Sequence, residues 1–264
     1  MARGDLTDQE WALIGLLLPP EHGRWARPAG ENRRFLNGML YVLRVGCPWR
    51  DMHERYGKWN SVYVRFRRWV EQGGDALLQT LVDLGLTDNW QHMVDSIVSP
   101  CPFTGYGRKR GAHSEAFGRS RGGFTSKIHA RCDTQGRPLG FVLTGGQVSD
   151  YKATDALMKL SVPTPKAMLA DRSYDSDSFR LDLLLRGILP VIPSRKGRST
   201  PQNTDWRRYK DRNRIERMFN KLKQMRRIAT RYDKTVLSFI SFLNLAAARL
   251  WIKPLVNATQ RSRN

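Results

Sequence analysis

The sequence predicts a mixed α/β fold preceded by a small all-helical domain. Apolar residues recur at helical spacing before about residue 90, whereas short β-rich runs alternate with helical segments after it. Three strands, a helix, a strand, a helix, a strand and two closing helices form an order typical of a mixed sheet flanked by helices. With 264 residues, the chain is long enough to bury a sizeable core.

The first ninety residues are expected to form three helices. Thr7 is a suitable N-cap for the first helix, which Pro19-Pro20 would end. The second helix should cover about 31–45, and the third about 61–72. Two short helices, a turn and a basic helix are typical of a helix-turn-helix, and the alternative is an ordinary helical bundle with a solvated basic face. The candidate DNA-binding side chains on the third helix are Arg65, Arg67 and Arg68.

Strands and helices are expected to alternate from about residue 91. The predicted strands are 92–98, 124–132, 138–143, 167–170 and 189–193, and the predicted helices are 152–160, 178–186, 209–231 and 235–252. The polar residues 194–207 predict a mobile loop. The domain division predicted from these patterns is 1–88 for a helical, helix-turn-helix-like domain, 89–254 for an α/β domain and 255–264 for a flexible basic tail.

The charge indicates a polyanionic partner. Lys and Arg total 45 against 24 Asp and Glu, a formal net charge of +21. Such self-repulsion is rare without a polyanion, and each DNA or RNA phosphate that the protein neutralises releases counterions. An anionic membrane is the weaker candidate because neither terminus forms a clean basic amphipathic helix. The apolar stretch Val236–Val256 contains Asn244, Arg249 and Lys253, so we expect a buried helix and no membrane partner.

The cysteines argue against a disulfide framework or a zinc finger. Their number is odd, no two have Cys-x-x-Cys spacing, and they are Cys47, Cys101 and Cys132. The five histidines form no metal-ligand pair at helical spacing. A reducing cytosol is the expected setting.

Two aspartates occupy similar places in the pattern. Asp95 interrupts the run Met93-Val94-Asp95, and Asp171 follows Leu169-Ala170. Acids gathered at strand ends are how α/β sheets present ligands to solvent. Either aspartate alone could equally be a helix cap or a turn residue.

A third acid lies on a predicted helix. Tyr209, Arg212, Glu216 and Lys223 have offsets 0, 3, 7 and 14, which at about 100° per residue places them on one stripe beside an apolar stripe. Glu216 would thus lie at the edge of the core, where a sheet could meet it. The alternative is a surface Arg212–Glu216 pair at i,i+4 spacing, which contributes only a few tenths of a kcal/mol.

Basic residues crowd two segments. From Tyr209 to Arg231 there are nine Lys or Arg and two acids, a balance of +7, which an adjacent DNA backbone would relieve. The glycine-rich run Gly118–Phe124 could bring backbone close to phosphates, or it could simply lead into a hairpin. The candidate DNA-binding residues in and beside this run are Arg119, Arg121 and Lys127.

At these residues the sequence resembles DDE transposases of the bacterial insertion-sequence-five type. The resemblance covers nearly the whole chain. It rests on LTDQEW, CPWRDMHERYGKWNSVYVRFRRW, GRSRGGFTSKIHA, LADRSYDSD and YKDRNRIERMFNKLKQMRRIATRYDK. The last segment fits the family signature Tyr-x2-Arg-x3-Glu-x6-Lys with Tyr209, Arg212, Glu216 and Lys223.

The resemblance implies an RNase H-like core with Asp95, Asp171 and Glu216 as catalytic metal ligands. It implies two Mg²⁺ ions, for which Mn²⁺ would substitute, and DNA cleavage followed by strand transfer. It further implies binding to the terminal inverted repeats and to target DNA, with Tyr209, Arg212 and Lys223 near the cut. A homo-oligomer in the active complex and a cytoplasmic, nucleoid-associated location are expected by analogy.

The sequence departs from the family pattern in two places. Where such proteins continue after the first acid with Thr, Arg and His, this chain has Ser96–Cys101, and Ser173 stands where Gly is usual. These departures favour one alternative to an active transposase, and a second, weaker alternative does not depend on them. One is a catalytically degraded relic that only binds DNA, and the other is a non-mobile RNase H-like nuclease.

Overall fold

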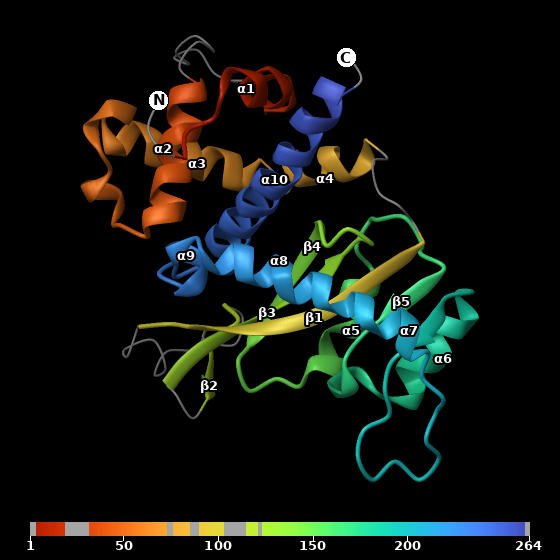
Figure 1. Cartoon of the computed structure of the whole chain (residues 1–264). Coiled ribbons are helices and arrows are strands. Elements are labelled where there is room, and N and C mark those ends of the chain that lie inside the picture. Colours follow the sequence, from red (N-terminus) through yellow and green to blue (C-terminus); the bar gives the residue numbers. More distant parts are fainter. Residues whose placement is uncertain are drawn as a thin grey trace. The chain divides into compact units, whose positions relative to one another are not determined.

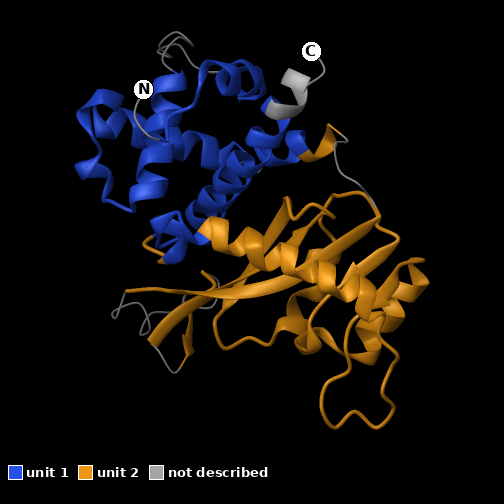
Figure 2. Cartoon of the chain, viewed as in Figure 1, with its two compact units in different colours: residues 1–81, 223–229, 233–264 blue, residues 82–222, 230–232 orange. Residues whose placement is uncertain are grey.

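The computed structural model describes residues 4–18, 32–72, 76–84, 90–102, 115–120 and 123–261 (Figure 1). The chain divides into two compact units, which are described separately (Figure 2). Unit 1 comprises residues 1–81, 223–229 and 233–264. Unit 2 comprises residues 82–222 and 230–232.

Unit 1 is helical in its described part. Its helices are α1 (Asp8–Ile14), α2 (Asn32–Val45), α3 (Trp59–Glu71), the first part of α4 (Ala76–Asp83), α9 (Arg226–Ala229) and α10 (Val236–Arg261). Thr7 caps α1 as expected. Its hydroxyl accepts a hydrogen bond from the Glu10 backbone N–H, and the Glu10 carboxylate accepts one from the Thr7 backbone N–H. The sequence analysis missed α4.

Aromatic rings form one part of the core of unit 1. Phe66 of α3 stacks on Phe242 of α10 with ring centroids 4.4 Å apart, and Trp49 lies 5.2 Å from Phe66. The Arg227 guanidinium lies 5.0 Å from the Phe242 centroid and pairs with Asp233. This core joins segments from both ends of the chain, so α10 completes the N-terminal helical unit.

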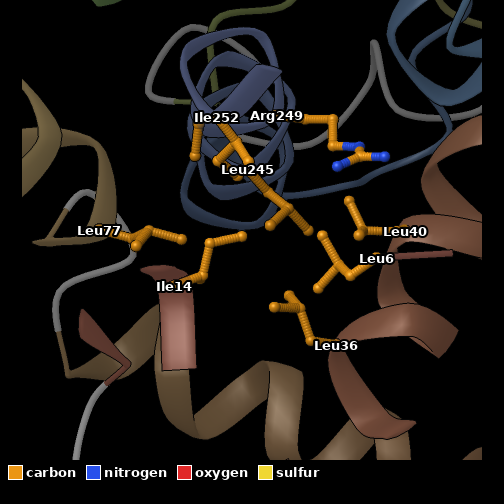
Figure 3. A pocket seen from close by; sticks show the side chains of 9 residues that line it. Leu6, Ile14, Leu36, Leu40, Leu77, Leu245, Arg249 and Ile252 are labelled. Carbon is orange, nitrogen blue, oxygen red and sulfur yellow. The ribbon is translucent and has the colours of Figure 1, made fainter. Parts of the chain in front are cut away.

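A second, aliphatic part of this core surrounds a small pocket (Figure 3). Leu6, Ile14 and Leu36 face Leu245 and the other lining side chains of α10. The adjoining Arg249 pairs with the buried Glu10 at 2.5 Å, so one ion pair links α10 to α1 beside apolar side chains.

The compact units divide the chain differently from the predicted domains. Residues 235–252 were predicted to belong to the domain 89–254, whereas α10 packs within unit 1, because its apolar side chains contact α1, α2 and α3. Residues 255–264 were predicted to form a flexible tail, whereas α10 continues to Arg261. Among the described residues, only the stretch Val236–Val256 of α10 is apolar and long enough to cross a membrane, and 61% of its apolar window is buried inside the protein.

Unit 2 is built on a mixed sheet. In the described part of the chain its six strands are β1 (Gln91–Pro100), β2 (Gly118–Ser120), β3 (Gly123–Cys132), β4 (Pro138–Gly145), β5 (Ala167–Leu169) and β6 (Leu189–Val191). They follow the order β2-β3-β1-β5-β6, and β4 pairs with β3. β1 is antiparallel to β3 and parallel to β5, so it is central.

Helices cover this sheet. The helices α5 (Thr154–Met158) and α6 (Asp177–Leu185) contribute Leu157, Phe179 and Leu183 to a buried cluster with Val94 of β1. The helix α8 (Asn213–Lys223) buries Ile215, Met218, Phe219 and Leu222. Because side chains alternate along a strand, Val94 and Ser96 share one face of β1, and Asp95 points to the other.

The predicted helix 209–231 is divided into shorter pieces. α7 (Trp206–Tyr209) is followed by a 3-10 turn, Lys210–Arg212, and then by α8. Two contacts anchor this turn to the sheet. Asp211 accepts from the Gln91 side chain at 2.8 Å, and Arg212 binds Asp95. These tertiary contacts outweigh the preference for a continuous helix.

A buried histidine on β1 pairs with a buried arginine on β3. His92 is fully buried, and its Nδ1 accepts from Nε of Arg131 at 3.0 Å. Arg131 also donates to the carbonyls of Leu157 and Pro163. Burial, and then the charge of Arg131, lower the pKa of His92 from 6.5 to about 3. His92 is therefore neutral in the folded protein.

This pairing predicts acid sensitivity. Since the pKa is lower in the folded than in the unfolded chain, the stabilisation is complete above pH 6.5 and decreases as the pH falls towards 3. The loss should approach about 1.4 kcal/mol per pH unit below the unfolded pKa. His92→Asn retains an acceptor but does not titrate, so urea unfolding between pH 7 and 4.5 should show a shallower fall. An unchanged slope in the variant would contradict this assignment.

Candidate active site

The first predicted acid, Asp95, lies in the middle of the central strand β1. Its carboxylate accepts from the Ser96 backbone N–H at 2.8 Å. The Asp95 side chain is only 16% exposed. A carboxylate this buried requires positive charge or hydrogen-bond donors close by.

The second acid, Asp171, follows the neighbouring strand β5. Because β1 and β5 are parallel with Met93 opposite Leu169, Asp95 and Asp171 both stand two residues beyond this pair. Asp171 accepts from the backbone N–H of Ser173 at 2.9 Å and from its hydroxyl, and so caps the 3-10 turn Arg172–Tyr174. Adjacent parallel strands thus place two carboxylates at corresponding positions of the sheet.

The third acid, Glu216, is connected to the first through Arg212. Nη1 of Arg212 donates to Oδ2 of Asp95 at 2.8 Å, and Nη2 donates to Oε1 of Glu216 at 2.5 Å. The i,i+4 pair considered from the sequence therefore exists, and the same guanidinium also reaches β1. Residues 117 positions apart in the chain share this contact.

The electrostatics show that the three acids share one environment. Burial first, and the charges of Asp171 and Glu216 in addition, raise the pKa of Asp95 to about 6, against the opposing effects of the Ser96 N–H and Arg212. Although burial lowers the pKa of Arg212, Asp95 and the other nearby groups raise it above its usual value. The site therefore holds more negative charge than one guanidinium neutralises.

The donor chemistry of this site suits hard divalent cations. Three carboxylates supply the oxygen ligands that Mg²⁺ prefers. In the part of the chain that is described, no three acidic, histidine or cysteine side chains form a ready-made metal site. The cation between Asp95 and Glu216 is instead Arg212, so metal binding requires that this guanidinium move away from the carboxylates.

The other two residues of the stripe, Tyr209 and Lys223, differ in their surroundings. The Tyr209 ring lies 5.5 Å from the Arg212 guanidinium, and burial raises the pKa of its hydroxyl. Lys223 is exposed at the end of α8. Tyr209 thus supports the guanidinium from the side, while Lys223 faces solvent.

One arginine and one lysine that were predicted to bind DNA instead make contacts within the protein. Arg65 is buried, hydrogen-bonds Asn32 and lies 4.8 Å from the Phe35 ring. Lys127 is only 13% exposed, pairs with Asp150 at 3.2 Å and donates to the Val148 carbonyl. Both side chains therefore belong to internal contacts, which helical and strand spacing did not reveal.

The remaining basic candidates are more accessible. Arg67 pairs with Glu71 at 3.2 Å, an exposed i,i+4 contact, and Arg68 is exposed on α3. Arg119 is exposed beside the Phe124 ring. Arg121 lies outside the described residues. Arg67, Arg68 and Arg119 thus remain candidates for phosphate contacts.

A fourth acid, Asp150, lies beside the site and was not predicted from the sequence. Asp150 begins a 3-10 turn after β4 and accepts from the Ser96 hydroxyl at 2.6 Å. Burial raises its pKa, but Ser96, Ser173 and Lys127 outweigh this effect and lower it. Asp171 directly follows its predicted strand, whereas Asp150 lies beyond the end of β4 at Gly145, so the strand-end pattern did not point to it.

Two family profiles match the sequence. The one described as "Transposase DDE domain" matches residues 92–251, more than half of the chain, and this range contains all three acids. The one described as "Putative transposase of IS4/5 family" matches residues 6–77. Each match falls on one of the two sequence regions distinguished above.

Two proteins with similar sequences are also described as transposases. The "Putative transposase for insertion sequence element IS6501" of Brucella ovis is 37% identical over 133 residues, which are 49% of this chain and 99% of that protein. The "Putative transposase for insertion sequence element IS402" of Burkholderia cepacia is 32% identical over 145 residues, 51% of this chain and 66% of that protein.

A solved structure is similar in fold. The piggyBac transposase, in a synaptic complex with hairpin DNA, aligns with 97% of this chain and 73% of its own, with 13% identity and a TM-score of 0.50. Together with the DDE-domain match, this likeness confirms the predicted RNase H-like α/β fold preceded by a helical region.

The Arg212 bridge predicts how metal affects stability. Arg212→Ala leaves Asp95 and Glu216 without their shared guanidinium, so the metal-free protein should lose about 2 kcal/mol of unfolding free energy. MgCl₂ should restore more stability to the variant than it adds to the unchanged protein, which urea unfolding with and without MgCl₂ measures.

A matched control is Arg186→Ala, which removes the exposed Arg186–Asp182 pair in the same unit. This control should cost about 0.5 kcal/mol or less and show no added response to MgCl₂. Equal responses of Arg212→Ala and Arg186→Ala would show that the guanidinium does not stand in for a metal ion.

Proposed function

Since the chain belongs to the family of transposases with a DDE domain, we propose that it cleaves the DNA ends of an insertion sequence and joins them to target DNA. Asp95, Asp171 and Glu216 would hold the divalent cations, two Mg²⁺ or Mn²⁺ in its place. The observation that carries this proposal is the single guanidinium that connects Asp95 on β1 with Glu216 on α8.

The chemistry requires a deprotonated nucleophile and a stabilised leaving oxygen. Bound divalent cations supply both. Asp95 and Asp171 offer their carboxylates from adjacent strands, and Glu216 offers its own from the helix that crosses them. A DNA 3′-OH bound in place of water would allow the same three acids to serve strand transfer.

Arg212 has a second role in this scheme. Divalent cations held by the three carboxylates would neutralise them, which would free the paired N–H groups of Arg212 for the oxygens of a DNA phosphate. Tyr209 lies beside the guanidinium and would keep it close to the site. Arg212 would therefore neutralise the acids in the metal-free protein and orient DNA in the loaded one.

DNA binding is proposed from charge and exposure. The net charge of +21 favours a polyanion, and accessible side chains include Arg68, Arg119 and Lys223. We assign residues 1–88 to recognition of the terminal inverted repeats and the DDE region to catalysis. Synapsis of two ends favours a homo-oligomer, and the DNA substrate favours a nucleoid-associated location in the cytoplasm.

DNA cleavage by variants of the three acids tests the proposed ligands. Asp95→Ala, Asp171→Ala and Glu216→Ala should each reduce Mg²⁺-dependent cleavage of end DNA by at least about a thousandfold, equivalent to about 4 kcal/mol. Binding of the same DNA should persist, because phosphate contacts come from basic residues. Cleavage of a plasmid carrying the element ends and a mobility-shift assay measure the two properties.

Asp182→Ala, which removes an exposed acid on α6, is the control and should retain cleavage. A near-normal rate in any one of the three variants would remove that residue from the ligand set. Binding without metal-dependent cleavage by the unaltered protein would instead identify a DNA-binding relic, and cleavage without joining would favour a non-mobile nuclease.

The second prediction concerns salt. DNA affinity should fall steeply with salt concentration, since each neutralised phosphate contributes a slope of about −0.9 in log K against log salt. Arg68→Ala and Arg119→Ala should each reduce the slope by about 1 if the side chain contacts a phosphate. Fluorescence anisotropy across a salt series measures this, and a flat response would contradict phosphate neutralisation.

A further inference from the structure

A second set of polar contacts lies on the opposite face of β1 from Arg212. Asp95 faces Arg212, and the next residue, Ser96, projects to the other side because strand side chains alternate. There the Ser96 hydroxyl donates to the Asp150 carboxylate at 2.6 Å. Asp150 thus holds the strand at the residue directly after a proposed ligand.

The same carboxylate lies beside the turn that carries the second aspartate. The Ser173 hydroxyl donates its one proton to Asp171, and the Ser173 side chain also helps to lower the pKa of Asp150. Ser96 and Ser173 belong to different segments, the one after Asp95 and the other after Asp171. One carboxylate therefore lies close to both segments and is hydrogen-bonded to the first.

Asp150 is itself fixed by neighbours on β3. Lys127 and His129 lie opposite Val98 and Ser96 in the β1–β3 register, so they share the Ser96 face. Nζ of Lys127 lies 3.2 Å from Oδ1 of Asp150, and Nδ1 of His129 lies 3.8 Å from the same oxygen.

These neighbours leave Asp150 little freedom. The Asp150 side chain is 18% exposed, and that of His129 is fully buried. The ring of His129 is held in turn by Thr144 at 2.8 Å. The carboxylate is a fixed point rather than a mobile surface group.

We propose that Asp150 is a positioning residue that holds Asp95 at the spacing from Asp171 needed for divalent cations, acting through Ser96. This inference rests on the proposed function. Groups behind metal ligands commonly decide affinity, because ligands that are already oriented lose less freedom when the metal binds. Lys127 neutralises Asp150, so the support adds no repulsion to the acids it positions.

The test is direct Mn²⁺ binding to the full chain, measured by calorimetry and by loss of the free-ion EPR signal. Asp150→Ala should weaken Mn²⁺ binding about tenfold or more. Asp150→Asn should weaken it less, because its amide oxygen still accepts from Ser96. Asp155→Ala removes the same charge from an exposed position on α5 and should change the dissociation constant less than twofold.

Coupling separates positioning from a general loss of stability. Ser96→Ala should weaken Mn²⁺ binding, and adding it to Asp150→Ala should weaken binding little further, because both changes remove the same hydrogen bond. Thermal unfolding and DNA binding should remain close to those of the unchanged protein in Asp150→Asn and Ser96→Ala. Unchanged Mn²⁺ affinity in Asp150→Ala, or fully additive effects with Ser96→Ala, would overturn the proposal.

Failure of the proposed function gives a different result. Asp171→Ala should abolish Mn²⁺ binding, and if it does not, the acids are not the metal ligands and the function proposed above fails. If Asp171→Ala abolishes binding while Asp150→Ala leaves it intact, only the positioning role is wrong.

Discussion

Repulsion among three acids at one site is the constraint on which the candidate active site depends. Asp95 is largely buried, and Asp171 and Glu216 both raise its pKa. The structure meets this constraint with one guanidinium, since Arg212 binds Asp95 and Glu216 together. The Arg212 guanidinium stabilises the metal-free protein because it neutralises the acids. The same contact would compete with divalent cations for the carboxylate oxygens.

The alternation of side chains along β1 separates two tasks. One face presents Asp95 to Arg212 and Glu216, where the charge would change on the proposed binding of cations and DNA. The other face holds Ser96 against Asp150, in contacts that need not change. A single central strand can therefore keep a rigid support on one side while the opposite side exchanges partners.

The positions of the three acids could be predicted from short sequence patterns. Helical spacing placed Glu216 beside an apolar stripe, and strand patterns placed Asp95 and Asp171, because each relation extends over a few residues. Long-range partners were not predictable. Asp150 meets Ser96 across 54 positions, and the predicted DNA contact Lys127 instead pairs with Asp150. The apolar composition of α10 indicated burial but not that it completes the N-terminal unit.

The central claim is that Asp95, Asp171 and Glu216 share divalent cations. The most direct measurement is an anomalous difference map from crystals of the protein grown with Mn²⁺ and a short end DNA. The account predicts Mn²⁺ peaks among the oxygens of these three acids, with the Arg212 guanidinium turned to a phosphate. Peaks elsewhere, with Arg212 still paired to both Asp95 and Glu216, would contradict it.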